Sequence, residues 1–559
     1  MKRNIALSVL ILAVLFPFAY SISLSGVRAY SRATLVQETG DVREYLASTV
    51  SARAAGRGNP WITLGDGHAA PADYRGSSTL LPLLRANLAR PLSLASADFD
   101  EDGVPDLVAG YAAMTDGVIS IQRGDVDAIF PNTTEAIANR RQLRAPNGGD
   151  IQSPFFSTSR LFDVPGAPDL MGTGDFDADG HLDVVAAQIG AGALVLLAGD
   201  GDGGFSPPRP IELPGVVTAL ATGDANRMDG LADVIVAVNG SKGARLLVYE
   251  SGAGALNGDP EVLQLPSESR SLAIGQLDDD YPVDMVVAAG RDLLIVQGRD
   301  RKHSTSAAKP ASVTRLSGPF PISSVAIGDF TGDLRNEIAL LSDDGKCHVF
   351  SRGKSTKGDS WRESSAAALR FSHKSPPVGP SSLLVPLRIS SSPKDDLLVL
   401  DRAGRQVHMI INESAVAPEN AGRGPASMNL RVAGALDFDG EPVAVLGMRL
   451  NVDALSDLVV LNSDSSAPIV IPTTPAAIFT VINTNDAGAG SLRQAITSAG
   501  TNPGADLINF AIPGAGTQTI NLVTPLPLIL QPVTIDGPTQ DPGSATPPIE
   551  LNGAGAGLG

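Results

Sequence analysis

A short acidic loop recurs seven times along the chain and constrains its fold more than any other feature. The copies read, in order, DFDEDGVPD from Asp98, DFDADGHLD from Asp175, DANRMDGLAD from Asp224, QLDDDYPVD from Gln276, DFTGDLRNE from Asp329, RISSSPKDD from Arg388 and RLNVDALSD from Arg449. Six copies share a nine-residue frame, and the copy at Asp224 has one extra residue. Neighbouring loops begin about 50 to 60 residues apart, except for a first gap of about 77 that predicts an insertion around residues 130–165.

Short apolar runs flank the loops. Residues 94–97 lead into the first loop and residues 107–109 lead out of it, and further runs such as 193–197 and 210–213 complete four strands per repeat. Strands that are apolar on both faces must be covered on both sides. The pattern therefore predicts an all-β, seven-bladed β-propeller. Only two strands follow the last loop, so we expect residues 79–89 to supply an outer strand and close the ring.

The D-x-D-x-D-G-x-x-D loops between paired strands resemble the FG-GAP/VCBS repeat family, which includes the head of the integrin alpha subunit. The loops at Asp98 and Asp175 match this motif in full, whereas those at Arg388 and Arg449 have lost the first acid. The resemblance covers residues 79–472. It implies a seven-bladed propeller with calcium on its lower hairpins and ligand recognition on another face.

The acidic loops have the composition of calcium sites. Calcium takes six to eight oxygen ligands, and alternate residues of a tight loop present their oxygens inward. The predicted ligands are Asp98, Asp100, Asp102, Asp106, Asp175, Asp177, Asp179, Asp183, Asp224, Asn226, Asp229, Asp233, Asp329, Asp333 and Glu337. Gln276, Arg388 and Arg449 argue against a metal in their loops. The alternative interpretation is that all seven are solvated turns, since Asp and Gly are the usual turn residues.

The pattern changes after residue 473, where no acidic loop recurs. The run GSLRQAI at residues 490–496 resembles the CSLREAI-like motif that opens right-handed parallel β-helix domains, with glycine in place of the leading cysteine. We expect residues 478–482, 507–510 and 533–535 to stack as rungs and residues 491–498 to form a capping helix. Residues 473–559 are thus predicted to be the start of a β-helix that continues in a longer protein.

The N-terminus predicts export. Met1-Lys2-Arg3 precedes an apolar stretch at residues 5–19, and Ala19-Tyr20-Ser21 supplies small residues for signal-peptidase cleavage. We therefore assign residues 1–21 to a signal peptide and residues 22–78 to a poorly ordered lead with at most a short helix at 42–50. No later segment is long enough to span a bilayer. Because Cys347 is the single cysteine, stabilisation by an internal disulfide is excluded, and calcium can take that role outside the cell.

The charge and the motifs narrow the classes of function. A net charge of -18 disfavours nucleic acid and anionic lipid as partners. H-E-x-x-H and G-x-S-x-G motifs are absent, so no catalytic residues are assigned and no enzyme is predicted. Arg123-Gly124-Asp125 spells an adhesion tripeptide, but it aligns with an ordinary blade hairpin.

These observations favour a secreted or surface-displayed binding or adhesion module for a cell-surface or extracellular protein or glycan. Two alternatives stay open. One is an accessory propeller of an extracellular polysaccharide-degrading enzyme whose catalytic β-helix continues beyond residue 559. The other is a purely structural stalk on the cell envelope.

Overall fold

The computed structural model describes most of the chain after residue 50. The described residues are 51–53, 62, 64–65, 67–113, 116–143, 153–225, 229–299, 310–355, 358–368, 384–390, 392–413, 428–453, 455–473, 477–502, 506–529, 533–542, 544 and 546–556. All of them belong to the unit formed by residues 47–559. The predicted signal peptide, the helix expected at 42–50 and the predicted ligand Asn226 lie outside the described residues.

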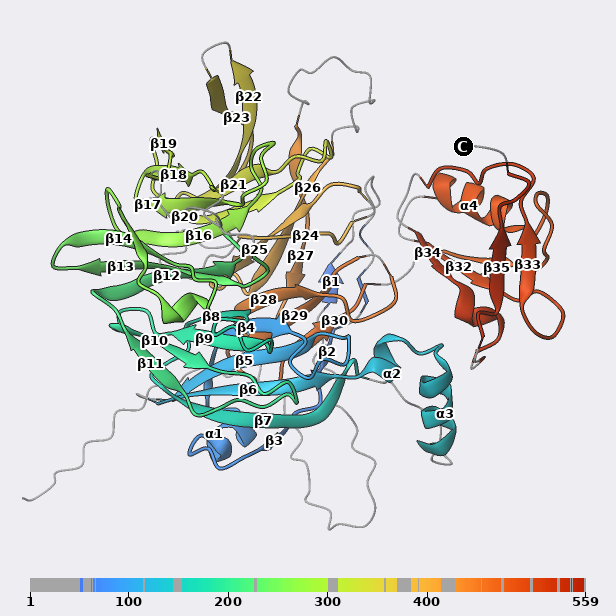
Figure 1. Ribbon diagram of the computed structural model, residues 1–559, viewed down its shortest axis with the longest axis horizontal. Helices are drawn as coiled ribbons and strands as arrows, with labels where there is room; N and C mark the ends of the chain where they lie inside the picture. The colour runs from blue at the N-terminus through green and yellow to red at the C-terminus, as the bar shows by residue number, and fades with distance from the viewer. Residues whose placement is uncertain are drawn as a thin grey trace, which may run out of the picture. The chain divides into compact units, whose positions relative to one another are not determined.

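Seven antiparallel sheets form the blades of a β-propeller (Figure 1). Along each sheet the strands are β4 (Arg90–Ala97), β5 (Asp106–Ala113), β6 (Asp116–Gly124), β7 (Phe155–Pro165) and β3 (Asp73–Arg75) in blade 1; β8 (Leu170–Gly174), β9 (Asp183–Ala187), β10 (Ala193–Leu197) and β11 (Arg209–Glu212) in blade 2; β12 (Val216–Gly223), β13 (Asp233–Gly240), β14 (Gly243–Tyr249) and β15 (Glu261–Gln264) in blade 3; β16 (Ser269–Gly275), β17 (Asp284–Ala289), β18 (Asp292–Val296) and β19 (Val313–Ser317) in blade 4; β20 (Ile322–Gly328), β21 (Glu337–Ser342), β22 (Lys346–Ser355) and β23 (Gly358–Ala368) in blade 5; β24 (Leu384–Leu387), β25 (Asp396–Asp401), β26 (Gln406–Asn412), β27 (Leu430–Asp437) and β1 (Ser51–Arg53) in blade 6; and β28 (Pro442–Met448), β29 (Asp457–Asn462), β30 (Ile469–Ile471) and β2 (His68–Ala69) in blade 7. Among the described strands of these seven blades, only β3 pairs in parallel with its neighbour.

The first strands of the blades line the centre of the ring. Each contacts the first strand of the next blade, from β4 through β8, β12, β16, β20 and β24 to β28, and β28 contacts β4 again. Figure 1 shows this closure, with the orange β28 beside the blue β4. The predicted seven-bladed propeller is therefore confirmed.

The hydrophobic cores lie between neighbouring blades. Val108 and Ile119 of blade 1, for example, form one cluster with Val184 and Val195 of blade 2. The second strands are covered on both faces, and all five residues of β9 are buried. This two-sided burial explains why these strands read as unbroken apolar runs rather than as alternating patterns.

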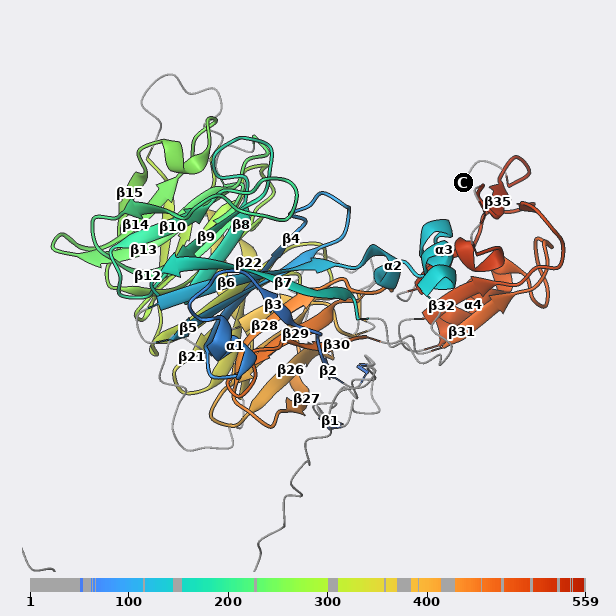
Figure 2. The ribbon, with the colours of Figure 1, turned by 90° about the horizontal axis from the view of Figure 1, so that it is seen from below.

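The ring closes at a place that the sequence analysis did not predict. The outer strand of blade 7 is β2, whose His68 and Ala69 pair antiparallel with Val470 and Ile469; the two strands lie side by side in Figures 1 and 2. The predicted strand at residues 79–89 is wrong, because this segment contains helix α1 (Leu81–Arg85).

Helix α1 forms for a local reason. Leu80 and Leu84 are four residues apart, so they share one helix face, and both pack into the cluster between blades 7 and 1. Pro82 lies in the first turn, where its missing N–H costs nothing. Since β1, β2 and β3 come from residues 51–75, part of the predicted lead segment belongs to the propeller sheets.

The remaining helices of the propeller are short. Helix α2 (Val126–Ile129) precedes the insertion predicted at residues 130–165, which contains α3 (Thr134–Leu143) and whose last third is strand β7. A single 3-10 turn, η1 (Ala255–Asn257), follows β14. Among the described residues, no helix has the length and apolar character needed to cross a membrane.

The C-terminal segment forms parallel sheets. Strands β31 (Ile478–Val481), β32 (Asp506–Phe510) and β34 (Val533–Asp536) pair in parallel, as do β33 (Gln518–Asn521) and β35 (Ile549–Asn552). Helix α4 (Leu492–Thr501) begins after Ser491, whose side chain accepts the N–H of Gln494, and η2 (Gly537–Gln540) follows β34. The helix expected at 491–498 is thus present, and the β-helix assignment of this segment stays a prediction.

Candidate metal centres

Among the residues that the structure describes, two of the seven loops bring three carboxylates together. Loops 1 to 7 are residues 98–106, 175–183, 224–233, 276–284, 329–337, 388–396 and 449–457, each connecting the first two strands of the blade with the same number. The carboxylates of Asp98, Asp100 and Asp106 in loop 1 each place an oxygen within 4.8 Å of the others, and so do those of Asp175, Asp177 and Asp183 in loop 2. Oxygens at this spacing are suited to one shared cation such as calcium.

The backbone of these loops turns tightly around their first aspartate. Asp175 accepts the N–H of Ala178 at 2.7 Å on Oδ1 and the N–H of Gly180 at 3.0 Å on Oδ2. Ala178 and Gly180 have φ angles of 64° and 95°. Only glycine adopts this left-handed conformation without cost, which explains the glycine at the sixth position.

Loop 2 also contains a buried carboxylate oxygen to which no described residue donates a hydrogen bond. Oδ1 of Asp177 is buried and has no hydrogen-bond partner among the described residues. Oδ1 of Asp224 in loop 3 is in the same state, while its Oδ2 accepts the N–H of Gly230 at 3.1 Å. Because a buried unpaired charge is costly, these orphaned oxygens fit a cation site.

Electrostatics in the loops also favour a cation. Burial, together with the charges of Asp100 and Asp177, raises the pKa of Asp106 to about 7 and that of Asp183 to about 6. Burial raises the pKa of Asp233 in loop 3 to about 8. Carboxylates crowded in this way repel one another, and a divalent cation would offset that repulsion.

The fifth-position aspartates lie outside the two triads. Oδ1 of Asp102 accepts the N–H of Val104 at 3.1 Å, and Oδ1 of Asp179 accepts the N–H of His181 at 2.9 Å. In loop 3, Oδ1 of Asp229 accepts the N–H of Leu231 at 3.2 Å. These predicted ligands therefore shape the turn and stand next to the site rather than in the cluster.

The last acid of the frame has a second role that sequence reasoning missed. In all seven loops it is buried, it begins the second strand, and it accepts the backbone N–H of the second loop residue. The pairs are Asp106 with Phe99 (2.9 Å), Asp183 with Phe176 (2.8 Å), Asp233 with Ala225 (2.8 Å), Asp284 with Leu277 (3.0 Å), Glu337 with Phe330 (2.9 Å), Asp396 with Ile389 (3.1 Å) and Asp457 with Leu450 (2.7 Å). Loops 6 and 7 keep this acid although they have lost the first one. That pattern in the sequence indicates a role for the last acid that does not depend on a metal.

Loops 5 to 7 satisfy the last acid with a side-chain donor in place of the third-position aspartate. The hydroxyl of Thr331 donates to Glu337 at 3.1 Å, the hydroxyl of Ser390 donates to Asp396 at 2.9 Å, and the Asn451 amide donates to Asp457 at 2.8 Å. Asp329, Asp333 and Glu337 form no triad, since the described residues contain such clusters only in loops 1 and 2.

Loop 1 differs from loop 2 in having an arginine that is ion-paired with its third-position aspartate. The guanidinium of Arg123, near the end of β6, forms an ion pair with Asp100 and lies 3.7 Å from Asp102. The equivalent position after β10 is Ala198, and Arg209 on β11 acts on loop 2 only through its charge, which lowers the pKa of Asp177. Loop 1 therefore presents its triad together with a competing cation.

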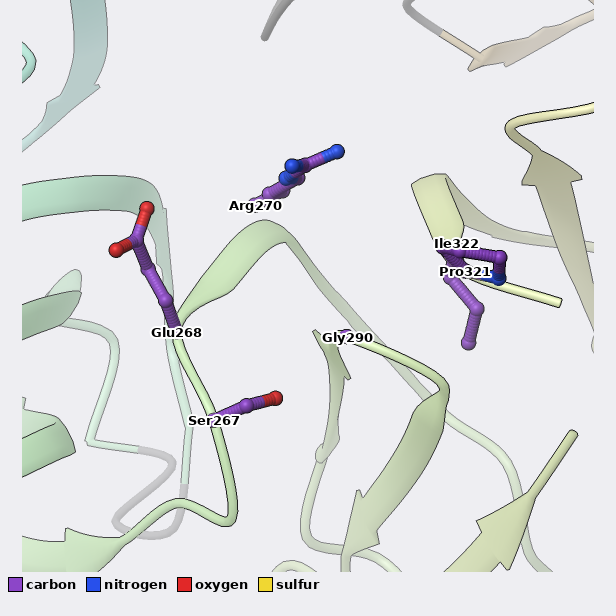
Figure 3. Close-up of a pocket in the computed structure, with 6 residues that line it drawn as sticks. All are labelled: Ser267, Glu268, Arg270, Gly290, Pro321 and Ile322. Carbon is purple, nitrogen blue, oxygen red and sulfur yellow. The ribbon is translucent and has the colours of Figure 1, made fainter.

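A shallow hollow lies at the opposite end of the strands from the acidic loops. It is lined by Ser267, Glu268, Arg270, Gly290, Pro321 and Ile322, and Figure 3 shows Pro321 and Ile322 across from Glu268 and Arg270. Glu268 accepts the Asn239 amide at 3.0 Å, and Arg270 lies 3.7 Å from Asp343. Both signs of charge and an apolar wall thus meet between blades 4 and 5.

Comparison with known proteins supports the repeat. Residues 175–227, which contain loop 2, match the model of the FG-GAP-like repeat family. No curated protein matches the chain. Two crystal structures of BBS1N in complex with ARL6DN, soaked with mercury or with lead, resemble it at 10% and 11% identity with TM-scores of 0.41 and 0.40; each match covers 69% of this chain and 93% of the other. The chain thus contains an FG-GAP-like repeat within a seven-bladed β-propeller.

Proposed function

We propose that the chain is a calcium-stabilised β-propeller that acts as a non-catalytic binding module outside the cell. The observation that carries the calcium assignment is the Asp175, Asp177 and Asp183 triad, in which a buried oxygen of Asp177 has no partner among the described residues. Asp98, Asp100 and Asp106 would hold a second ion. Bound calcium would supply positive charge to the loops, and at millimolar concentration each weak extracellular site adds about 0.4 to 1.4 kcal/mol.

A binding function is favoured over catalysis because a propeller combines a constant scaffold with freely variable loops. The hollow between blades 4 and 5 is the surface we propose for a protein or glycan partner, since Glu268 and Arg270 offer an acceptor and a donor beside the apolar Ile322. It lies at the other end of the strands from the metal loops. The expected role of calcium is therefore to stiffen the scaffold rather than to contact the partner.

The test of the calcium proposal is thermal unfolding of the full chain in millimolar calcium and in chelator, together with the number of calcium ions bound per chain. Asp175→Ala and Asp177→Ala are expected to remove one bound ion and to reduce the calcium-dependent rise in melting temperature. Asp116→Ala, a change at an exposed aspartate at the start of β6, is the control and should leave both readouts unchanged. If the parent chain binds no calcium, the loops are solvated turns.

The proposal also includes export through a signal peptide and a C-terminal domain that begins a β-helix. Cleavage near Ala19-Tyr20-Ser21, read by N-terminal sequencing of the mature protein, would support secretion. The parallel register that stacks Phe479, Ile508 and Ile535 supports assigning residues 473–559 to the first rungs of a β-helix. A crystal structure in which these strands do not wind as successive rungs would contradict that assignment.

A further inference from the structure

Loop 6 contains a buried lysine. Lys394, at the seventh position of the loop, is only 2% exposed. Its Nζ atom donates to the backbone carbonyl of Asn412 at 3.5 Å. A buried ammonium group is costly unless negative charge lies close to it.

The neighbouring blade supplies that charge. Burial lowers the pKa of Lys394, whereas the charges of Asp329 in loop 5 and Asp396 in its own loop raise this pKa. The Lys394 side chain also packs over loop 5, since a Cβ atom placed on Gly332 would lie 3.0 Å from its Cγ. Lys394 therefore reaches across the seam between blades 5 and 6.

Hydrogen bonds from backbone and side-chain groups connect blades 5 and 6 at this point. The N–H of Asp329 donates to Oδ2 of Asp395 at 2.9 Å, and the N–H of Asp395 donates to the carbonyl of Asp329 at 2.8 Å. The Asn412 side chain, from the end of β26, donates to the carbonyl of Phe330 at 2.8 Å. Loop 5 thus has a fixed position relative to the lysine.

Loop 5 has no orphaned oxygen of the kind found in loop 2. Asp329 accepts the N–H of Gly332 at 2.6 Å on Oδ1 and the N–H of Leu334 at 2.9 Å on Oδ2. The third position is Thr331, whose hydroxyl donates to the buried Glu337. In loop 5, a hydroxyl donor and a nearby ammonium group thus stabilise the carboxylates. In loop 2, the carboxylate triad has neither of these groups among the described residues.

We propose that the Lys394 ammonium is the resident cation of loop 5, and that it joins blades 5 and 6 in the place that a metal ion takes in loops 1 and 2. The comparison with loops 1 and 2 rests on the proposed calcium function, but the role of Lys394 does not. It is measured in chelator, so a failure of calcium binding at Asp175 leaves it intact. The two proposals are therefore separable.

The first experiment is a double-mutant cycle on the full chain in chelator. Lys394→Met should lower the melting temperature by about 5 °C, because it leaves the half-buried Asp329 without a neighbouring cation. Asp329→Asn should cost less in the Lys394→Met background than in the parent chain. The control is Lys346→Met, since Lys346 pairs with Asp344 at 2.7 Å on the surface and should contribute little. If Lys394→Met does not fold, Lys394→Gln gives the same cycle.

The second experiment counts calcium ions in the full chain. Asp329→Ala should leave the number unchanged, whereas Thr331→Asp combined with Lys394→Ala should add one ion by restoring the third acid and removing the ammonium group. Additive effects in the cycle would overturn the proposal, because the two residues would then not interact. Where the parent chain binds calcium, loss of one ion in Asp329→Ala would also overturn it, and so would a Thr331→Asp/Lys394→Ala chain that gains no ion; where the parent chain binds none, the double-mutant cycle in chelator alone decides.

Discussion

Oδ1 of Asp183 accepts a hydrogen bond from the backbone N–H of Gly199 at 2.8 Å. Asp183 begins β9 and Gly199 follows β10, while Oδ2 of Asp183 accepts the N–H of Phe176 in the loop before β9. One buried carboxylate thus joins three segments of blade 2. Asp106 and Asp284 make the corresponding contacts in blades 1 and 4. The last acid of the frame therefore stabilises the blade with or without a metal.

This dual role predicts that two aspartates in different loops respond differently to calcium. Asp396→Ala should destabilise the chain equally in calcium and in chelator, by about 2 to 4 kcal/mol, because it leaves the buried N–H groups of Ile389 and Ser390 unpaired. Asp177→Ala should lower stability only in calcium. Chemical denaturation under both conditions measures this, and an Asp396→Ala effect that grows with calcium would contradict the structural role.

The buried acids also predict a pH dependence. Burial raises the pKa of Asp396 to about 7, and hydrogen bonds from Ser390 and Ile389 lower this pKa only in part. The carboxyl of an unfolded chain titrates near pH ~3.9, so between these values the folded chain holds a proton that the unfolded chain has released. The associated stability is complete below about pH 4 and is lost as the pH rises through 7.

We therefore expect a chain in chelator to lose stability from pH 5 to pH 8, and Asp396→Asn to lose less over the same interval. Melting temperatures of the parent chain and of Asp396→Asn at pH 5 and at pH 8 measure how much stability each loses with rising pH. Asp116→Asn, at an exposed position, is the matched control and should keep the parent slope. Identical slopes for Asp396→Asn and the parent chain would show that Asp396 is already ionised at pH 5.

The propeller could be predicted because its repeat combines a chemical signature with a packing signature. The loops fix the number of blades, and the apolar runs fix the second strands, which need cover on both faces. The closure could not be predicted. Strand β2 has only two residues, too few for any periodic pattern, while the apolar run at residues 79–89 suits a helix face as well as a strand.

The candidate site could be predicted only in its composition. The Asp98, Asp100 and Asp106 cluster and its counterpart in loop 2 follow from the motif. Backbone N–H groups are common to all residue types except proline, so the sequence does not show which of them donate to the last acid. Arg123 and Lys394 approach from another hairpin or blade, and a pattern confined to nine residues cannot reveal them.

The ion pair between Arg123 and Asp100 predicts that loop 1 binds calcium less tightly than its motif allows. Removing the guanidinium in Arg123→Ala should tighten calcium binding about threefold, as expected for the loss of a partly exposed competing ion pair. Calorimetric titration measures this. Arg160→Ala is the matched control, because Arg160 is also on blade 1 but donates to the carbonyls of Asp202 and Gly203. Unchanged or weaker binding in Arg123→Ala would exclude competition.

Loop 5 has a leucine where loops 1 and 2 have glycine, and this difference predicts a stabilising substitution. Leu334 has a φ angle of 63° and is 94% exposed, whereas Gly103 and Gly180 occupy the same position at 91° and 95°. The left-handed conformation costs a leucine about 1 to 2 kcal/mol. A glycine avoids this cost, but it stabilises the unfolded chain by about 0.5 to 1 kcal/mol because it gives that chain more conformational entropy. Leu334→Gly should therefore stabilise the chain by about 0.5 kcal/mol. Leu88→Gly, at an exposed leucine without a positive φ, should not stabilise it, and equal effects of the two changes in a denaturation experiment would refute the strain argument.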